Sequence, residues 1–176
     1  MLFKELSIKG IYLISPKPYK DKRGFFSRHF CDKEFKKNKI EFKVRQSNIS
    51  ENKAIGTLRG FHHQKYPFQE GKILSCLNGK FYDIIVDLRK NSQTYKKWVS
   101  VTLSSENRKM LYVPKGCANA FMTLKEHTII HYYCSQYYNP NYEQGIRFND
   151  PIFKFKWPMK PKVISSKDLN FINFTD

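Results

Sequence analysis

The sequence predicts an all-β protein, with a jelly roll as the leading architecture, on three observations. Short runs rich in aromatic and β-branched residues recur about every 8–12 residues, with turn-forming residues between them. Asn78-Gly79 stands between two such runs, and this dipeptide favours a tight hairpin turn. Helical signal is confined to one short segment. Together these features are typical of a β-sandwich or barrel with a few short helices.

The N-terminal elements follow from local patterns. Residues 3–13 alternate loosely between apolar and polar side chains, and prolines at positions 16 and 18 end this first expected strand. Residues 21–24 read Asp-Lys-Arg-Gly and predict a turn before two phenylalanines, with Gly24 at a positive φ. Asp32 is expected to cap a short helix over residues 33–38.

The clearest local prediction is a hairpin over residues 73–88. In its second strand Ile84 and Val86 would lie on an apolar face, with Asp83 and Asp87 on a polar one. Four further strands are expected at residues 98–103, 109–113, 120–124 and 128–135.

The composition fits one folded domain over residues 1–176. The chain is 40% hydrophobic and 16% aromatic, and it shows no repeat or linker. From residue 140 it is irregular, so we expect a tail that wraps the barrel and returns residues to its mouth. No run approaches the roughly 20 apolar residues of a membrane helix, and the first residues do not resemble a signal peptide. A cytoplasmic protein without a membrane partner is therefore expected.

The charge balance is strongly basic. The formal net charge is +17, from 32 Lys and Arg against 15 Asp and Glu. Such an excess favours anionic partners, which include nucleic acids and phosphorylated small molecules. The basic residues are nevertheless spread along the chain without an Arg-rich arm. We therefore expect no nucleic-acid partner, and a basic β-barrel that binds nucleic acid remains the alternative outside the enzymes.

The sequence contains none of the common motifs for binding a metal or a nucleotide cofactor. The cysteines form no CxxC pair and are interpreted as packing residues; they are Cys31, Cys76, Cys117 and Cys134. The sequence contains no GxGxxG, GxxxxGK[ST] or GxSxG. The adjacent histidines His62 and His63 would diverge on a strand, so no metal site is expected.

The stretch GTLRGFHHQKYPFQEGK, residues 56–72, concentrates the polar chemistry. Only one of His62 and His63 can face a given side of an extended strand. Lys72 can meet His62 only if the chain turns between them, and Tyr66-Pro67 is the natural place. An imidazole near a lysine indicates proton transfer beside a developing negative charge. The alternative is a polar strand–loop–strand on a solvated surface.

Short motifs in a fixed order run along nearly the whole chain. Residues 21–26 resemble DxRGFF, residues 46–50 resemble QxNxS, residues 58–64 resemble LRGLHYQ, and Gly71-Lys72 matches the end of QGK. Further matches are residues 82–89 to FDVAVDLR, 132–134 to YKC, 137–140 to YYxP, 145–151 to GIRWxDP and 166–168 to SEKD. Each motif is weak alone, but their order is specific. The chain resembles the dTDP-4-dehydrorhamnose 3,5-epimerases of the cupin superfamily.

The resemblance implies a cupin jelly-roll subunit of a cofactor-free homodimer acting on a nucleotide-linked 4-keto-6-deoxy sugar. A ketone at C4 acidifies the protons on C3 and C5, so a base can form an enolate and an acid can return a proton to the opposite face. By resemblance His62 is the base and Asp168 orients it. Lys72 would stabilise the enolate oxygen, and Tyr132 would be the acid.

The same resemblance implies a set of substrate-binding residues. Arg23 and Arg59 would hold the diphosphate through charge-assisted hydrogen bonds. The other positions that match the family's nucleotide or sugar pocket are Phe25, Arg28, Gln46, Asn48, Asn119, Tyr138, Glu143 and Lys167.

Two departures from the family pattern concern the substrate. Ser27-Arg28 stands where an acidic residue usually follows RGFF, and Asn119 stands where AHGF has histidine. Both leave the proposed base, lysine and acid in place. They leave two substrates as equal alternatives, a dTDP-linked hexose and a GDP-linked heptose for bacterial capsule or lipopolysaccharide synthesis. A C3-only epimerase is a further alternative, because protonation at C5 depends on geometry.

Overall fold

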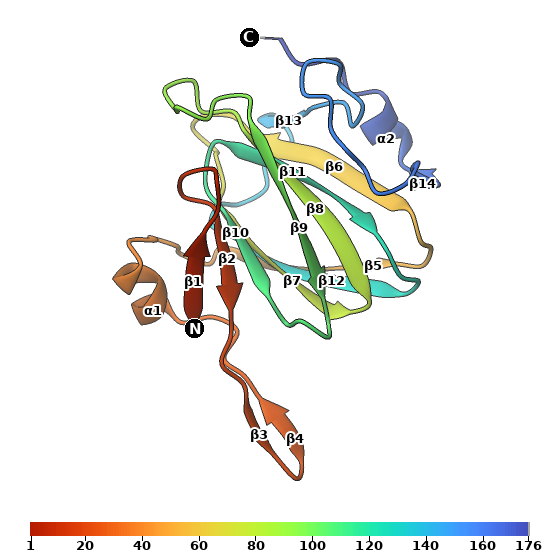
Figure 1. The fold of residues 1–176 in the computed structure, drawn as a ribbon. Helices are drawn as coiled ribbons and strands as arrows, with labels where there is room; N and C mark the ends of the chain where they lie inside the picture. Colours follow the sequence, from red (N-terminus) through yellow and green to blue (C-terminus); the bar gives the residue numbers. More distant parts are fainter. Residues whose placement is uncertain (176) are drawn as a thin grey trace.

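Two mainly antiparallel sheets face each other in the computed structural model, which describes residues 1–175 (Figure 1). The first sheet contains, in spatial order, β1 (Leu2–Glu5), β2 (Tyr12–Ser15), β10 (Met110–Val113), β7 (Lys72–Asn78), β12 (Thr128–Cys134) and β5 (Gln46–Asn52). The second contains β13 (Glu143–Gly145), β6 (Thr57–Gln64), β11 (Cys117–Thr123), β8 (Lys80–Asp87) and β9 (Trp98–Ser104), with β14 (Val163–Ile164) parallel to β6. A separate hairpin, β3 (Tyr19–Asp21) and β4 (Gly24–Phe26), and two short helices, α1 (Asp32–Lys37) and α2 (Ser166–Leu169), complete the fold. The all-β jelly roll with a few short helices is confirmed.

The main hydrophobic core lies between the two sheets. Ile85 and Leu103 of the second sheet and Leu74 and Ile130 of the first belong to one buried cluster. Burying each such side chain contributes about 1.5–3 kcal/mol relative to exposure. Within the described residues, no helix is long and apolar enough to cross a membrane.

Each sheet is also covered on its outer face. Phe35 of α1 packs against Tyr112 on the first sheet. On the second sheet Phe61 stacks on Phe155 of the tail, with ring centroids 4.3 Å apart, and Phe153 stacks on Phe155 at 5.0 Å. The predicted wrapping of the tail is confirmed, because β13 and β14 both pair with β6.

The predicted hairpin at Asn78-Gly79 is wrong. Gly79 does take a positive φ of 80°, but β7 pairs with β10 and β12, whereas β8 pairs with β11 and β9. The chain therefore crosses between the sheets at this turn. The predicted polar face of β8 is also not solvated: Asp83 and Asp87 lie on the same side of the strand as Ile85 and are 0% exposed.

The single strand predicted over residues 3–13 is wrong, because this segment contributes to two strands. Residues 3–13 divide into β1 and the start of β2, which pair with each other, and the turn between them buries Ile8 and Ile11. The loose alternation of the sequence does not reveal this reversal. The turn at residues 21–24 is confirmed, with Gly24 at φ 128°.

The helix cap was also predicted at the wrong residue. Asp32 is the first residue of α1, and the N-cap is Cys31, which makes no side-chain capping hydrogen bond. The Asp32 carboxylate instead pairs with Lys36 one turn along, at 2.8 Å. The four later predicted strands correspond to β9, β10, β11 and β12, with β11 starting earlier than expected, at Cys117.

Candidate active site

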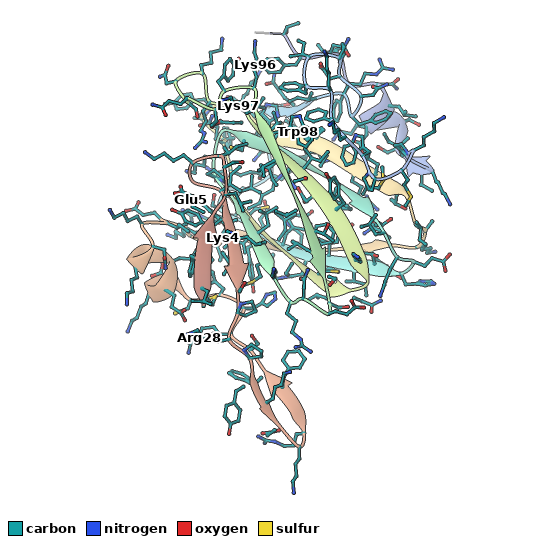
Figure 2. The ribbon with its side chains drawn as sticks, viewed as in Figure 1. Lys4, Glu5, Arg28, Lys96, Lys97 and Trp98 are labelled. Atoms are coloured by element: carbon teal, nitrogen blue, oxygen red, sulfur yellow. The ribbon has the colours of Figure 1, made fainter. Side chains whose placement is uncertain are left out.

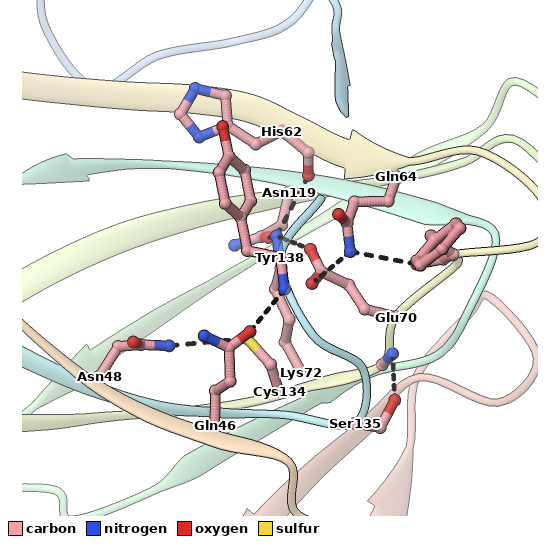
Figure 3. A network of polar contacts seen from close by, with 12 residues as sticks. Gln46, Asn48, His62, Gln64, Glu70, Lys72, Asn119, Cys134, Ser135 and Tyr138 are labelled. Carbon is pink, nitrogen blue, oxygen red and sulfur yellow. Dashed lines mark hydrogen bonds and ion pairs between the residues drawn. The ribbon is translucent and has the colours of Figure 1, made fainter. Parts of the chain in front are cut away.

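Two adjacent cavities lie between the sheets, and three of the predicted catalytic residues line both. Their volumes are about 390 and 420 Å³. The shared residues are His62 of β6, Lys72 of β7 and Tyr132 of β12. The first cavity also includes Arg59 and Asn119. The fold thus brings together side chains from both sheets at one junction (Figure 3).

His62 and Asp168 form a hydrogen-bonded pair across a separation of 106 residues. His62 Nε2 lies 2.7 Å from Asp168 Oδ1, and the Gly60 N–H donates to the other carboxylate oxygen at 3.2 Å. Burial opposes ionisation of Asp168, but the hydrogen bonds from His62, Gly60 and Ser165 outweigh it and lower the pKa of Asp168 below its usual value. An ionised Asp168 can therefore orient the imidazole and stabilise its protonated form.

The tail positions Asp168 through local chemistry that the sequence analysis missed. Parallel pairing of Ile164 with Leu58 holds the tail beside β6 just before α2. Ser165 then caps α2, its hydroxyl accepting from the Asp168 N–H at 3.1 Å. A serine three residues before an aspartate is a helix-start signal, and it could have revealed α2.

Lys72 contacts three oxygen acceptors. Its ammonium lies 3.2 Å from Glu70 Oε1, donates to the His62 carbonyl at 3.2 Å and to Asn119 Oδ1 at 3.5 Å. The turn at Tyr66-Pro67 that this meeting requires is present. Glu70 was not among the predicted site residues, although it belongs to the polar stretch 56–72.

Behind Asn119 lies a buried carboxylate. Asn119 Nδ2 donates to Asp83 Oδ2 at 3.1 Å, and Asp83 is 0% exposed. Burial raises the pKa of Asp83 well above its usual value, against the opposing effect of the Asn119 hydrogen bond. The Asn119 amide nitrogen thus faces Asp83 and its oxygen faces Lys72.

Tyr132 and Arg59 complete the first cavity. Burial raises the pKa of Tyr132 above its usual value, so its hydroxyl stays protonated at neutral pH and can act as an acid. Arg59 donates to Asn52 Oδ1 at 2.9 Å and keeps further N–H groups for other acceptors. Its side chain lines the same cavity as Tyr132.

The second cavity collects five of the predicted substrate-binding residues. They are Gln46, Asn48, Tyr138, Glu143 and Lys167. Glu143 Oε2 accepts from the Tyr138 hydroxyl and from Lys167, each at 2.6 Å. Gln46 Oε1 accepts the Tyr138 N–H at 2.6 Å. Together these contacts hold an aromatic ring beside a polar, charged wall.

Three predicted binding residues lie away from these cavities. Arg23 pairs with Asp21 at 2.6 Å within the β3–β4 hairpin, which projects from the body of the fold (Figure 1). The guanidinium of Arg108 sits 4.1 Å from the ring centroid of Phe25. Arg28 lies near the base of the hairpin and pairs with Glu34 at 3.2 Å (Figure 2). Motif position alone could not show that this segment leaves the body.

The two adjacent histidines have different surroundings. Both line the second cavity, but His62 also lines the first, whereas His63 also lines a third cavity, of about 360 Å³, beside tail residues 170–175. Burial, with smaller contributions from Lys72 and His62, lowers the pKa of His63 to about 4, so its imidazole is neutral at pH 7. Among residues 1–175, no group of three His, Cys, Asp or Glu side chains is arranged to hold a metal.

A jelly roll that brings a His–Asp pair, a lysine and a tyrosine to one cavity has the groups that an enzyme of acid–base type needs. The family model of dTDP-4-dehydrorhamnose 3,5-epimerase matches residues 5–176. The chain belongs to this family of cupin-type epimerases, and this displaces the nucleic-acid-binding alternative.

Similar proteins agree with this assignment. A dTDP-4-dehydrorhamnose 3,5-epimerase of Sinorhizobium fredii is 43% identical over 169 residues, covering 96% of this chain and 87% of that protein. The crystal structure of the Elizabethkingia anophelis enzyme of the same name superposes with a TM-score of 0.95 at 35% identity, covering 99% and 96% of the two chains. The Bacillus anthracis enzyme, solved with TDP and pyrophosphate bound, also gives 0.95 at 35% identity, with 98% and 99% coverage.

Proposed function

We propose that the protein inverts C3 and C5 of a dTDP-linked 4-keto-6-deoxy hexose through enolate intermediates, in the cytoplasm. The observation that carries this proposal is the junction of the two cavities, where His62, Lys72 and Tyr132 meet. A base and an acid drawn from different sheets can address opposite faces of a sugar ring between them. Family membership supplies the reaction class.

The mechanism follows from the roles of four side chains. His62, oriented by Asp168, takes the proton from the carbon next to the ketone, and the C–H electron pair moves to the C4 oxygen as an enolate. Lys72 stabilises that oxygen, and the Tyr132 hydroxyl returns a proton to the opposite face of the carbon. Each inversion leaves His62 protonated and Tyr132 deprotonated, so both groups exchange with solvent before the second inversion.

The nucleotide is proposed to be dTDP because the relatives described above carry dTDP sugars in their names or TDP in their structures. The GDP-heptose alternative rested partly on the charge of Arg28, and that charge is paired with Glu34 outside the cavities. Asn119 alone remains as an argument for a different substrate.

We also propose a homodimer. Tyr19, Phe25 and Phe26 on the projecting hairpin are 69%, 53% and 75% exposed, and burying such rings against a second copy would be favourable. In that assembly Arg23 and Phe25 would reach the partner's second cavity. Sedimentation of the purified protein tests this, with a monomer at micromolar concentration as the contrary result.

The test of function is proton NMR in D₂O with dTDP- and GDP-linked 4-keto-6-deoxy sugars. Loss of both the C3 and C5 signals of the dTDP sugar is expected. Loss at C3 alone would establish the mono-epimerase instead, and exchange of only the GDP sugar would reverse the choice of nucleotide. The folded protein exchanging neither sugar would overturn the proposed function.

A further inference from the structure

The ammonium group of Lys72 is surrounded before any substrate arrives. It has three N–H donors and three oxygen neighbours, on Glu70, His62 and Asn119, at 3.2, 3.2 and 3.5 Å (Figure 3). The side chains of Lys72 and Glu70 are only 13% and 11% exposed. These three protein groups therefore orient the ammonium group of Lys72, and of the three only Glu70 carries a charge.

Glu70 is itself held firmly. Its second oxygen accepts from Gln64 Nε2 at 3.2 Å, and Gln64 is only 3% exposed. Gln64 Oε1 accepts the Asn139 N–H at 2.6 Å, which ties it to the loop that carries Tyr138. The next residue along the chain, Gly71, donates its N–H to Ser135 Oγ at 2.7 Å. Figure 3 shows Gln64 and Ser135 on either side of Glu70.

The three acceptors around Lys72 differ in strength. Glu70 is a carboxylate and the His62 oxygen is part of the β6 backbone, so neither yields easily to a ligand. The Asn119 oxygen is neutral, lies farthest away, and belongs to an amide anchored on its other side by Asp83. An incoming ketone oxygen would therefore replace Asn119 and leave the other two contacts in place.

We propose that Glu70 is a positioning residue that holds Lys72 so that one N–H remains directed at the ketone oxygen. The proposal rests on the proposed function, because it assigns Lys72 to the enolate. Where the family motif reads QGK, this chain reads Glu70-Gly71-Lys72. Glu70→Gln keeps the shape and one oxygen acceptor but removes the charge, whereas Glu70→Ala removes the contact. Comparing the two variants therefore separates the effect of the hydrogen bond that positions Lys72 from the effect of the charge of Glu70.

The experiment measures kcat and KM for C3–H exchange with both variants. Because a misplacement of about 1 Å can cost about 10²-fold, Glu70→Ala should lose roughly that much in kcat with KM nearly unchanged. Glu70→Gln should lose clearly less than Glu70→Ala, because its amide oxygen still accepts from Lys72 and only the contact with Gln64 Nε2 is lost. Wild-type kcat in Glu70→Ala, or an equal loss in both variants, would overturn the proposal.

A matched control and a structural readout complete the test. Glu106→Gln makes the same substitution in an exposed pair with Lys125, where the side chains are 71% and 53% exposed, and should change neither constant. Crystal structures of the free proteins should show Lys72 Nζ in place in Glu70→Gln and displaced by about 1 Å or more in Glu70→Ala. An unmoved Nζ in Glu70→Ala would overturn the proposal even if no tested sugar proved to be a substrate. Failure of the proposed function would appear instead as a wild type without exchange.

Discussion

The body of the fold and the projecting hairpin each contain an aspartate bonded to an arginine two residues later. In β8 and the loop after it, Asp87 accepts from Arg89 Nε at 2.8 Å and is 0% exposed. In the hairpin, Asp21 accepts from Arg23 at 2.6 Å, and the Arg23 side chain is 89% exposed. The same Asp-x-Arg motif thus forms an ion pair with a buried carboxylate in one region and a solvent-exposed ion pair in the other. A motif match identifies residues, and their surroundings decide what the residues do.

The predicted site residues also differ between the body of the fold and the projecting hairpin. The cavity residues come from both sheets and the tail, and several are held by contacts distant in sequence, such as His62 with Asp168 and Lys72 with Asn119. The hairpin residues contact mainly their own segment, the Phe25–Arg108 pair being an exception. One chain therefore supplies all the residues that line the two cavities, and in the proposed dimer the hairpin of a second copy would add Arg23 and Phe25.

The largest expected effect comes from removing the base. His62→Asn should lower C3 and C5 exchange about 10³-fold or more, because the variant lacks a group that can take the proton. NMR exchange rates in D₂O measure this. His127→Asn, at an exposed histidine with φ 50°, is the matched control and should exchange like the wild type. Residual activity above a tenth of wild type would contradict the role of His62.

Removing the acid should have a smaller and more selective effect. Tyr132→Phe keeps the buried ring but loses the hydroxyl, so product inversion should fall about 10²-fold. Proton removal by His62 should persist, and deuterium should then enter the sugar without inversion of configuration. Mass and NMR analysis of the recovered sugar distinguishes these outcomes. Normal inversion would show that another group supplies the proton.

The hairpin should affect binding rather than chemistry. Arg23→Ala should raise KM about tenfold with little change in kcat, as expected for a lost charge-assisted contact to the diphosphate of the partner's substrate. Lys22→Ala, at the adjacent turn position, is the control. An unchanged KM would remove Arg23 from the binding site and weaken the case for a shared cavity.

The two Asp–Arg pairs should differ in stability. Burial opposes ionisation of Asp87, but hydrogen bonds from Arg89, Ser92 and Thr94 lower its pKa to about 2. Because the folded pKa is depressed, the stabilisation is present above the ordinary pKa and is lost as the pH falls from about 4 to 2. Asp87→Asn should therefore lower the free energy of unfolding by about 2 kcal/mol at pH 7.

Denaturant unfolding of Asp87→Asn and the wild type measures this difference at both ends of the pH range. The difference should shrink toward pH 2, where protonation of the wild-type Asp87 carboxylate sets in. Asp21→Asn in the hairpin should leave the unfolding free energy nearly unchanged. Equal losses in the two variants would contradict the comparison between the regions.

Local pattern was sufficient for much of the fold. Strand composition and spacing predicted the jelly roll, and the local turn pattern predicted the positive φ angle at Gly24. Motif order predicted the family and the identities of His62, Lys72, Tyr132 and Asp168. The strands and the turn depend on backbone preference, which neighbouring residues already determine, whereas the family and the four site residues came from the resemblance of the ordered motifs.

Tertiary structure decided which segments meet. Gly79 turns the chain, but β7 and β8 find their partners in different sheets, β10 and β12 for the first and β11 and β9 for the second. Asp168 reaches His62 because β14 pairs with β6, and Asn119 reaches Lys72 because β11 lies beside β6 across the cavity from β7. Such contacts depend on satisfying buried polar groups and filling the core across distant parts of the chain. No local stretch of the sequence contains that information.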